Sequence, residues 1–360
     1  MGPSYLETLR NFHIPSCSTR VKESMVWRPG RPADVGVGGH HPLERVEVEG
    51  ASRGSPSRRG ERAVWENGAM DETIFSFTAD DGQEVAAYRW VGSGEPRGIV
   101  QILHGMGEHA GRYRRLAGAL TDAGYVVYAA DHRGHGRTAG SVERLGDFGP
   151  GGWPGLMADI GQLAGIARSE FPGLPLVMIG HSMGSFALQQ YLLDHSIELA
   201  GAVLSGTSAI DVIAAGIDPT QEVDLSAFNA PFEPARTEFD WLTRDPDEVD
   251  LYIADDHCGF GVDAAAAASM LDSLTVCSDA DRLAAIRSDL PIYLVSGSAD
   301  PLAGGGELIE LVAGRYRDAG IVDVTVVVVP DARHEVFNET IRDEITSALI
   351  AWVDRVTEGS

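Results

Sequence analysis

The sequence predicts an α/β fold in which a mostly parallel β-sheet is covered by helices on both faces. Three observations indicate this class. Short apolar runs alternate with segments of helical character over most of the chain. Several of these runs are apolar throughout, as expected for strands that are buried on both faces. One of them, Val177–Ile179, leads through a Gly-x-Ser-x-Gly turn into a helical segment, so a serine stands at the end of a predicted strand.

The expected elements follow one another along the chain. Strands are predicted at 73–78, 84–91, 98–103, 125–130, 177–179, 199–204, 291–297 and 322–329, and the first two form an antiparallel hairpin. Helices are predicted at 109–123, 155–170, 187–193, 307–319 and 339–356. The last helix places apolar residues at helical spacing, which we expect to face the core: Ile341, Ile345, Leu349, Trp352 and Val353.

The regular alternation stops between residues 207 and 289. This segment contains several aromatic residues, four prolines and one alanine-rich helix at 264–274. It holds 18 acidic and 4 basic residues, a balance of −14. An irregular insertion after a core strand is typical of a lid or cap, and a surface excursion without a function is the alternative. We therefore assign residues 70–206 and 290–358 to an α/β core domain and residues 207–289 to a cap.

Residues 1–69 differ from the rest in composition. They hold 10 basic and 8 acidic residues, whereas residues 70–360 hold 18 basic and 45 acidic ones. Gly, Pro, Ser and Arg are frequent, and no periodic apolar pattern runs through them. We predict a disordered leader, with Met70 as a possible start of the protein. An interaction arm is the alternative.

Charge and composition restrict the classes of partner. A net charge of −25 argues against nucleic acid and anionic lipid surfaces as partners. No apolar run approaches the roughly 20 residues of a membrane span, and the N-terminus lacks the apolar region of a signal peptide. The three cysteines form no disulfide framework; a bridge between Cys258 and Cys277 is conceivable, but reduced thiols are the simpler interpretation. We expect a soluble, cytoplasmic protein without stable membrane insertion.

The turn Gly180-His181-Ser182-Met183-Gly184 carries a candidate nucleophile. A serine hydroxyl reacts only when it is held within reach of a general base. A sharp turn would strain the backbone of Ser182, and the two glycines remove side chains that would collide. The helix that follows points free N–H groups at the place where an oxyanion would form. The pentapeptide alone is weak evidence, because glycine–serine turns are common, so the assignment depends on its position at a strand end.

Two further polar residues, Asp300 and His334, follow the ends of predicted core strands. Taken singly, Asp300 before Pro301 could be a turn or cap residue, and His334 could be an exposed loop histidine. Together with Ser182 they give the chain order serine, acid, histidine, as in the α/β-hydrolases. There the histidine takes the serine proton and the carboxylate orients the imidazole and stabilises its charged form. We predict that these three residues form a catalytic triad.

The glycine-rich segment His104-Gly105-Met106-Gly107 follows another strand. Its two glycines let the backbone pass close to the serine, so that the N–H group of Met106 can join that of Met183 in an oxyanion hole. We expect His104 to position this loop rather than to act as the base.

Two histidines later in the chain, His132 and His135, alternate with small and charged residues in a pattern that metal ligands also adopt. No cysteine or well-spaced carboxylate completes such a site, so we favour a structural loop and predict no metal centre.

Five blocks in order resemble the monoacylglycerol lipase and lysophospholipase-like branch of the α/β-hydrolases, of the serine aminopeptidase S33 type: His104–Tyr113, Asp131–Gly136, Gly180–Gly184, Gly297–Pro301 and Ala332–Glu339. The resemblance runs from about Asp71 to Val356. It implies an α/β-hydrolase fold with a cap, a triad of Ser182, Asp300 and His334, oxyanion donors at Met106 and Met183, and no metal or organic cofactor. Members of this branch cleave monoacylglycerols, lysophospholipids or other carboxylic esters.

From the residues and the resemblance together we expect a serine hydrolase that cleaves monoacylglycerol-like or other neutral monoacyl esters through an acyl-enzyme. The acidic insertion argues against docking on anionic lipid and so against lysophospholipase activity. Thioesterase, amidase or acyltransferase activity of the same three residues remains an alternative, as does a non-catalytic protein that binds a small ligand. The acyl chain length, the alcohol and the oligomeric state are left open. The acidic composition with a single lysine, Lys22, fits adaptation to high salt, but a compositional bias of the source genome explains the scarcity of lysine equally well.

Overall fold

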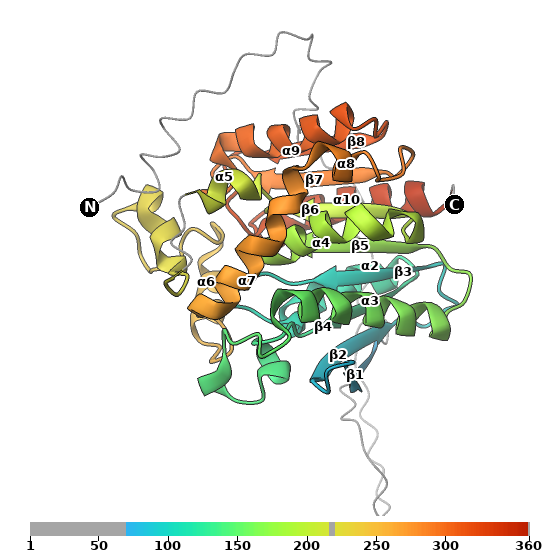
Figure 1. Ribbon diagram of the computed structural model, residues 1–360, viewed down its shortest axis with the longest axis horizontal. Helices are drawn as coiled ribbons and strands as arrows, with labels where there is room; N and C mark the ends of the chain where they lie inside the picture. The colour runs from blue at the N-terminus through green and yellow to red at the C-terminus, as the bar shows by residue number, and fades with distance from the viewer. Residues whose placement is uncertain (1–69, 216–219, 359–360) are drawn as a thin grey trace, which may run out of the picture.

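All eight predicted strands form, and they join in one sheet (Figure 1). The computed structural model describes residues 70–215 and 220–358, so the predicted leader at 1–69 lies outside the described residues. The strands are β1 (Asp71–Thr78), β2 (Glu84–Val91), β3 (Gly98–Leu103), β4 (Tyr125–Ala130), β5 (Leu176–His181), β6 (Gly201–Ser205), β7 (Ile292–Gly297) and β8 (Val324–Val329). Their order in the sheet is β1-β2-β4-β3-β5-β6-β7-β8. β2 pairs antiparallel with β1 and β4, and the remaining pairs are parallel.

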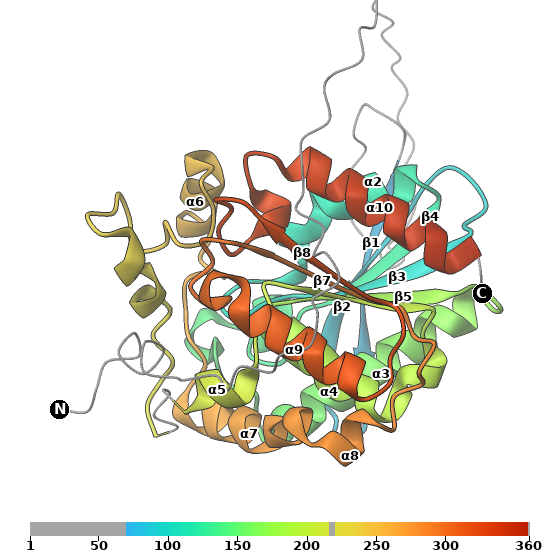
Figure 2. The ribbon, with the colours of Figure 1, turned by 90° about the horizontal axis from the view of Figure 1, so that it is seen from above.

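Helices cover both faces of the sheet, as predicted (Figure 2). The main helices are α2 (Arg114–Asp122), α3 (Gly152–Glu170), α4 (Met183–His195), α9 (Glu307–Asp318) and α10 (Arg342–Glu358). α2 and α10 pack on one face, and α3, α4 and α9 pack on the other. Strands β3 to β7 are buried at every position, which explains why their sequences are apolar throughout rather than alternating. The predicted apolar stripe of the last helix lies in the core at Ile345, Leu349, Trp352 and Val353.

Four helices begin at other positions than predicted. α4 begins at Met183 rather than at 187. The segment 109–123 starts with a short 3-10 turn, η1 (Ala110–Tyr113), before α2. α3 begins three residues earlier than expected, at Gly152. α10 begins at Arg342 rather than at 339, because Glu339 is extended and its buried carboxylate accepts the Arg333 N–H at 2.9 Å. A residue used in this way cannot also form the first turn of the helix.

The insertion between β6 and β7 is built from short helices, of which only α7 was predicted. They are α5 (Ile210–Ala214), η5 (Leu225–Phe232), α6 (Pro246–Ile253), α7 (Ala264–Leu274), η6 (Thr275–Ser278) and α8 (Ala280–Leu283). α7 packs against α3 and α4, whereas η5 and α6 lie beyond one end of the sheet (Figure 1). We call residues 207–215 and 220–289 the cap. The division of the chain into core and cap stays a prediction.

The composition has direct structural consequences. No lysine occurs after Lys22, so every ion pair between side chains of residues 70–215 and 220–358 uses arginine or histidine as its cation. Cys258 and Cys277 are free thiols, so the conceivable bridge between them is not formed. Within the two described stretches, no helix is both long enough and apolar enough to cross a bilayer.

Candidate active site

Ser182 lies between the end of β5 and the start of α4 in a strained backbone conformation, with φ of +50° and ψ of −119°. Non-glycine residues rarely adopt positive φ, and such strain is concentrated at functional sites. A Cβ atom at Gly184 would overlap the carbonyl oxygen of Leu103, and one at Gly180 would overlap the backbone of Gly184. Gly184 is therefore required by the close packing of this turn against the end of β3, and Gly180 by the tightness of the turn itself, as the sequence indicated.

His334 and Asp300 lie together at the ends of β8 and β7. His334 Nδ1 donates to Asp300 Oδ2 at 3.0 Å. The same carboxylate accepts the hydroxyl of Ser296 at 2.7 Å and the N–H group of Leu302 at 2.9 Å. His334 is 1% exposed and Asp300 is 2% exposed, so neither is the exposed loop residue or simple turn residue that the sequence left open. With its Nδ1 proton donated to Asp300, the neutral imidazole has its lone pair at Nε2.

The charged forms of His334 and Asp300 stabilise each other. Burial lowers the pKa of His334, but the Asp300 carboxylate, followed by Glu335 and Glu108, outweighs burial and raises the pKa above its usual value of 6.5. Burial raises the pKa of Asp300, and His334 with the hydrogen bonds to the carboxylate lowers it to below its usual value of 3.8. Asp300 therefore stays ionised, and it can stabilise an imidazolium at His334.

Ser182 and His334 line one cavity of about 50 Å³, together with Met106 and Met183. Among the described residues, no hydrogen bond joins Ser182 Oγ to His334. Such bonds are often long in proteins without substrate and shorten when substrate binds. The apolar lining of the cavity comes mostly from the cap: Ile210, Ile213, Val223, Leu225, Phe228, Trp241, Leu242 and Met270.

The loop after β3 passes directly against the serine, as predicted. A Cβ atom at Gly105 would lie 3.2 Å from Ser182 Cβ. The Gly105 N–H donates to Glu108 Oε1 at 2.6 Å, and the Gly107 N–H donates to His135 Nε2 at 3.3 Å. Between these two amides, the Met106 N–H has no acceptor in the described part of the chain. Because Met183 is the first residue of α4, its N–H also lacks a partner within the helix. Met106 and Met183, the two predicted oxyanion donors, thus line the cavity, and neither N–H group is used in the backbone hydrogen bonds described above.

Hydrogen bonds to two buried histidines connect this loop to the loop after β4. His104 Nε2 accepts the N–H group of His132 at 2.8 Å, and His135 accepts that of Gly107. Burial is the main cause that lowers the pKa of His104 well below its usual value, that of His132 to about 3 and that of His135 to about 4. The Nε2 atoms of His104 and His135 therefore act as neutral acceptors for backbone N–H groups, in line with the structural loop that we favoured over a metal site.

One group of described residues has the geometry to hold a metal ion: ligand atoms of His109, Asp255 and Cys258 lie within 4.8 Å of one another. His109 Nε2 is already bonded to Asp255 Oδ2 at 2.9 Å, and His109 Nδ1 accepts the Gly111 N–H at 3.2 Å. Burial raises the pKa of the Cys258 thiol, which opposes the thiolate that a metal needs. These contacts favour a structural connection between the cap and the loop after β3.

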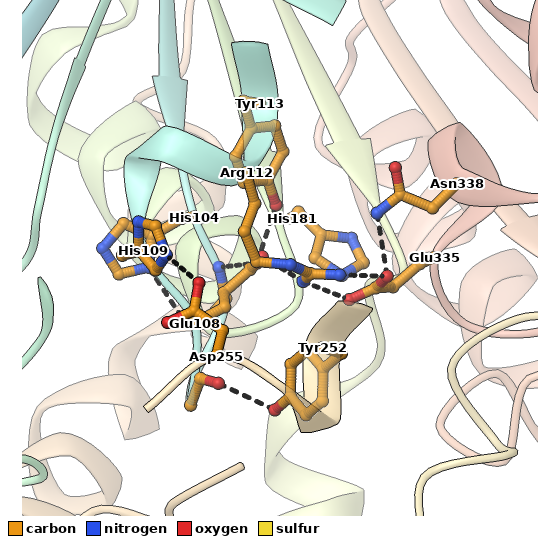
Figure 3. Close-up of polar contacts among 12 residues, drawn as sticks. His104, Glu108, His109, Arg112, Tyr113, His181, Tyr252, Asp255, Glu335 and Asn338 are labelled. Atoms are coloured by element: carbon orange, nitrogen blue, oxygen red, sulfur yellow. Dashed lines mark hydrogen bonds and ion pairs between the residues drawn. The ribbon is translucent and has the colours of Figure 1, made fainter. Parts of the chain in front are cut away.

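The sequence analysis assigned no role to Glu108, Arg112 and Glu335, which the structure brings together beside the cavity (Figure 3). Two signals were present. Glu108 and Arg112 have the i, i+4 spacing of an ion pair within one of the five sequence blocks, and Glu335 directly follows His334. Neither signal pairs the two segments, which are 223 residues apart.

Comparisons with known proteins identify the family of the chain. The family model described as "Serine aminopeptidase, S33" matches residues 94–341. The chain is 34% identical over 286 residues to a monoacylglycerol lipase of Mycolicibacterium smegmatis, covering 77% of this chain and 95% of the relative. It is 28% identical to human monoglyceride lipase over 72% of this chain and 86% of the relative.

Solved structures are similar as well. A thermostable carboxyl esterase from Bacillus coagulans superimposes with a TM-score of 0.72 at 30% identity, covering 79% of this chain and 99% of the esterase. A lipase in its open form superimposes with a TM-score of 0.69 at 29% identity, with the same coverage. These similarities confirm the predicted fold and the predicted resemblance: the chain belongs to the serine aminopeptidase S33 family of α/β-hydrolases.

Proposed function

We propose that Ser182, His334 and Asp300 of this ester hydrolase form its catalytic triad, with the N–H groups of Met106 and Met183 as the oxyanion hole. One observation carries the proposal. A serine in a strained turn faces the same small cavity as a histidine that is hydrogen-bonded to a buried carboxylate. This is the set of groups that nucleophilic acyl transfer requires.

The reaction follows from these positions. Ser182 Oγ attacks the ester carbonyl while His334 Nε2 takes its proton, and Asp300 stabilises the imidazolium. The two N–H groups hold the oxyanion of the tetrahedral intermediate. Collapse of the intermediate breaks the bond to the alcohol, which leaves with the proton from His334 and gives an acyl-enzyme. Water, deprotonated by His334, then releases the carboxylic acid and restores the serine.

Neutral monoacyl esters are the proposed substrates. The curated relatives carry the names monoacylglycerol lipase and monoglyceride lipase. The cap lines the cavity with apolar side chains that suit an acyl chain. The carboxylates of Glu108 and Glu335 also line the cavity, and they would repel an anionic head group.

Replacement of the nucleophile tests this function. We expect Ser182→Ala to lower kcat for p-nitrophenyl butyrate and for a monoacylglycerol by about 10⁴-fold or more, as loss of a triad nucleophile does. A fluorophosphonate probe should label the wild-type protein at Ser182 and leave the variant unlabelled. Ser347→Ala, at an exposed position of α10, is the control and should behave as wild type. Turnover by Ser182→Ala at near wild-type rate would refute the assignment.

Amide hydrolysis is a second candidate, because the family description names an aminopeptidase. An acyl-enzyme forms equally from esters, thioesters and amides, so the triad does not separate them. A panel of p-nitrophenyl esters, acyl thioesters and aminoacyl p-nitroanilides decides between them. A kcat/KM for an aminoacyl amide above that for every ester would replace the ester assignment.

We further infer a cytoplasmic location and no nucleic acid partner. The free thiols of Cys258 and Cys277 and the net charge of −25 support these two inferences. Fractionation of the source cells tests the location, and a gel-shift measurement with duplex DNA at low salt tests the absence of binding.

A further inference from the structure

Arg112 lies between two carboxylates from distant parts of the chain (Figure 3). Its guanidinium donates to Glu108 Oε2 at 2.6 Å. The same nitrogen, Nη1, also donates to Glu335 Oε1 at 2.6 Å, and Nη2 donates to Glu335 Oε2 at 2.8 Å. Arg112 thus binds Glu335 through two parallel hydrogen bonds. Bidentate pairs of this kind fix the relative orientation of both groups. We call Glu108, Arg112 and Glu335 the ion triad.

The ion triad is buried, and its remaining polar atoms are satisfied. The side chains of Arg112, Glu108 and Glu335 are 11%, 3% and 6% exposed. Glu108 Oε1 accepts the Tyr113 hydroxyl at 2.7 Å, and Glu335 Oε2 accepts the Asn338 amide at 2.8 Å. Every partner of the two carboxyl groups is a donor, so both fit as carboxylates. Two carboxylates and one guanidinium carry a formal charge of −1.

Each member of the ion triad is tied to a segment that borders Ser182. Glu108 holds the N–H group of Gly105, the residue before the proposed oxyanion donor Met106. Glu335 directly follows His334 in the chain. Arg112 is therefore the only cation of the described residues that contacts both of these carboxylates, and it joins the loop after β3 to the loop after β8.

The cap is attached to the same unit. The Arg112 guanidinium lies 4.8 Å from the ring centre of Tyr252, in α6. The Tyr252 hydroxyl donates to the carbonyl oxygen of Gly107 at 2.7 Å. The Glu335 N–H donates to the carbonyl oxygen of Leu242 at 2.7 Å. The ion triad thus has contacts to the loop after β3, to the loop after β8 and to the cap.

We propose that the ion triad is a positioning unit for the proposed reaction: it fixes the oxyanion loop against the loop of the base, and it holds negative charge beside the His334 imidazole. Its members touch neither the ester bond nor the proton in transfer, and they act through Met106 and His334. The proposal rests on the proposed function, because it assigns the roles of base and oxyanion donor to those two residues.

The surroundings of His334 support the electrostatic part. Asp300 is its direct partner, and Glu335 and Glu108 are the further groups that raise its pKa. The His181 ring lies 4.7 Å from the His334 ring, but burial, followed by His334 itself, lowers the pKa of His181 to about 4, so it is neutral near pH 7. The Trp241 ring, at 4.8 Å, carries no charge. Burial raises the pKa of Glu335, but Arg112 outweighs it and lowers the pKa to about 2, so its charge persists through the working pH range.

Two substitutions at Glu335 separate charge from geometry in the full-length protein. Glu335→Gln removes the charge and weakens the fork. We expect kcat for p-nitrophenyl butyrate to fall about 10- to 100-fold with KM within about 3-fold, and the acid limb of the kcat/KM profile to move down by about half a pH unit. Glu335→Asp keeps the charge but shortens the side chain, so kcat should fall while the acid limb stays within about 0.2 units of wild type.

A buried ion pair between Arg133, in the loop after β4, and Asp159, in α3, provides the control. Arg133 binds Asp159 through a similar fork, at 2.7 and 3.0 Å, and both side chains are buried. Asp159→Asn should lower the melting temperature as much as Glu335→Gln does. It should leave kcat and the acid limb unchanged. If Asp159→Asn reproduces the shift of the acid limb, the effect of Glu335 is a general loss of stability and the proposal is wrong.

A titration by NMR removes the dependence on turnover. The ring Cε1–H signal of His334, assigned with His334→Gln in histidine-labelled protein, reports its protonation directly. We expect the midpoint to be lower in Glu335→Gln than in wild type and unchanged in Asp159→Asn. Equal kcat and equal midpoints in wild type and Glu335→Gln would overturn the proposal. Absence of ester turnover and of Ser182 labelling in the wild type would overturn the proposed function instead, and the NMR midpoints would still show whether the ion triad controls the charge of His334.

Discussion

The two walls of the cavity are built in opposite ways. The core wall carries most of the polar groups of the cavity, and hydrogen bonds hold most of these groups in place, as in the pair of His334 and Asp300. The cap wall is apolar and comes from several short segments that share no common framework, such as those around Leu225 and Met270. The difference indicates that the core sets the reaction and the cap sets the substrate. The cavity of about 50 Å³ is far below the roughly 300 Å³ at which ligand sites begin, so we expect its lining to move apart when an ester binds.

The largest effect is expected on the core wall, at the carboxylate. Asp300→Asn should lower kcat about 10⁴-fold with little change in KM, because the amide stabilises neither the tautomer nor the charge of the imidazole. Asp331→Asn, the same change at an exposed residue of the neighbouring loop, is the matched control and should retain wild-type activity. A kcat of Asp300→Asn within 10-fold of wild type would show that the core wall does not depend on this residue.

A smaller effect is expected from filling the space beside the two imidazoles. A Cβ atom at Gly206, which has φ of +54°, would lie 2.9 Å from Cε1 of both His181 and His334. We expect Gly206→Ala to displace His334 and to lower kcat about 10²-fold. Gly140→Ala imposes similar backbone strain at φ of +80° in open space, so it should reduce stability but not kcat. Equal kcat values for the two variants would contradict the tight fit of the core wall.

The buried histidines behind the loop after β3 make the fold sensitive to acid. Burial lowers the pKa of His132 to about 3 and that of His135 to about 4, whereas in the unfolded chain both have values near 6.5. Their contribution to stability is therefore complete above pH 6.5 and is lost as the pH falls toward 4. We expect urea unfolding to show a loss on the order of 1–2 kcal/mol per histidine at pH 5. His132→Asn should reduce this pH dependence, and His195→Gln, at a half-exposed position, should not.

Enzyme activity should also decline as the pH falls, but for a different reason than the loss of folding stability. The raised pKa of His334 means that the base is protonated already at a pH above 6.5, so kcat/KM should fall as the pH drops through that higher value. A pH profile of p-nitrophenyl butyrate hydrolysis, compared with the melting temperature at each pH, distinguishes the two losses. An acid limb below pH 6 would contradict the upward shift.

The smallest effect is expected on the cap wall. Phe228 lines the cavity and packs on Trp241, with ring centres 5.1 Å apart. Phe228→Ala should raise the ratio of kcat/KM for octanoate over butyrate esters by about 3- to 10-fold and leave kcat for butyrate within about 2-fold. Phe232→Ala in the same short helix lies outside the cavity and should not change the ratio. A loss of kcat for both esters would show that the cap wall takes part in the reaction.

The same contrast explains what the sequence could predict. Strands β2, β3 and β4 begin and end where predicted, because each is apolar or alternating over its full length and bounded by turn residues. Ser182, Asp300 and His334 could be proposed from the sequence because each follows a predicted strand. The short cap helix α6 was missed, since its eight residues expose Leu251 and Ile253 and show no clear apolar face. The leader at 1–69 lies outside the described residues and stays a prediction.

Contacts between segments that are distant in the chain could not be predicted from the sequence. Glu108 and Arg112 have only the i, i+4 spacing of a local ion pair, and nothing in the sequence indicates that Glu335 completes them. Gly206 looks like any glycine after a strand until the two imidazoles are placed against it. In both cases the fold brings together residues that are far apart in the sequence, and the neighbouring residues in the chain do not indicate the contact.

The absence of lysine from residues 70–358 has a practical consequence. A guanidinium keeps its proton at any pH in which an ester assay is run, so alkaline loss of activity would have to come from groups other than the arginine partners of the ion pairs. Guanidinium groups also resist acylation by activated esters under conditions that modify primary amines. Lys22 is the sole side-chain amine of the sequence, so amine-directed coupling to a dye or a solid support should leave the hydrolase fold itself chemically untouched.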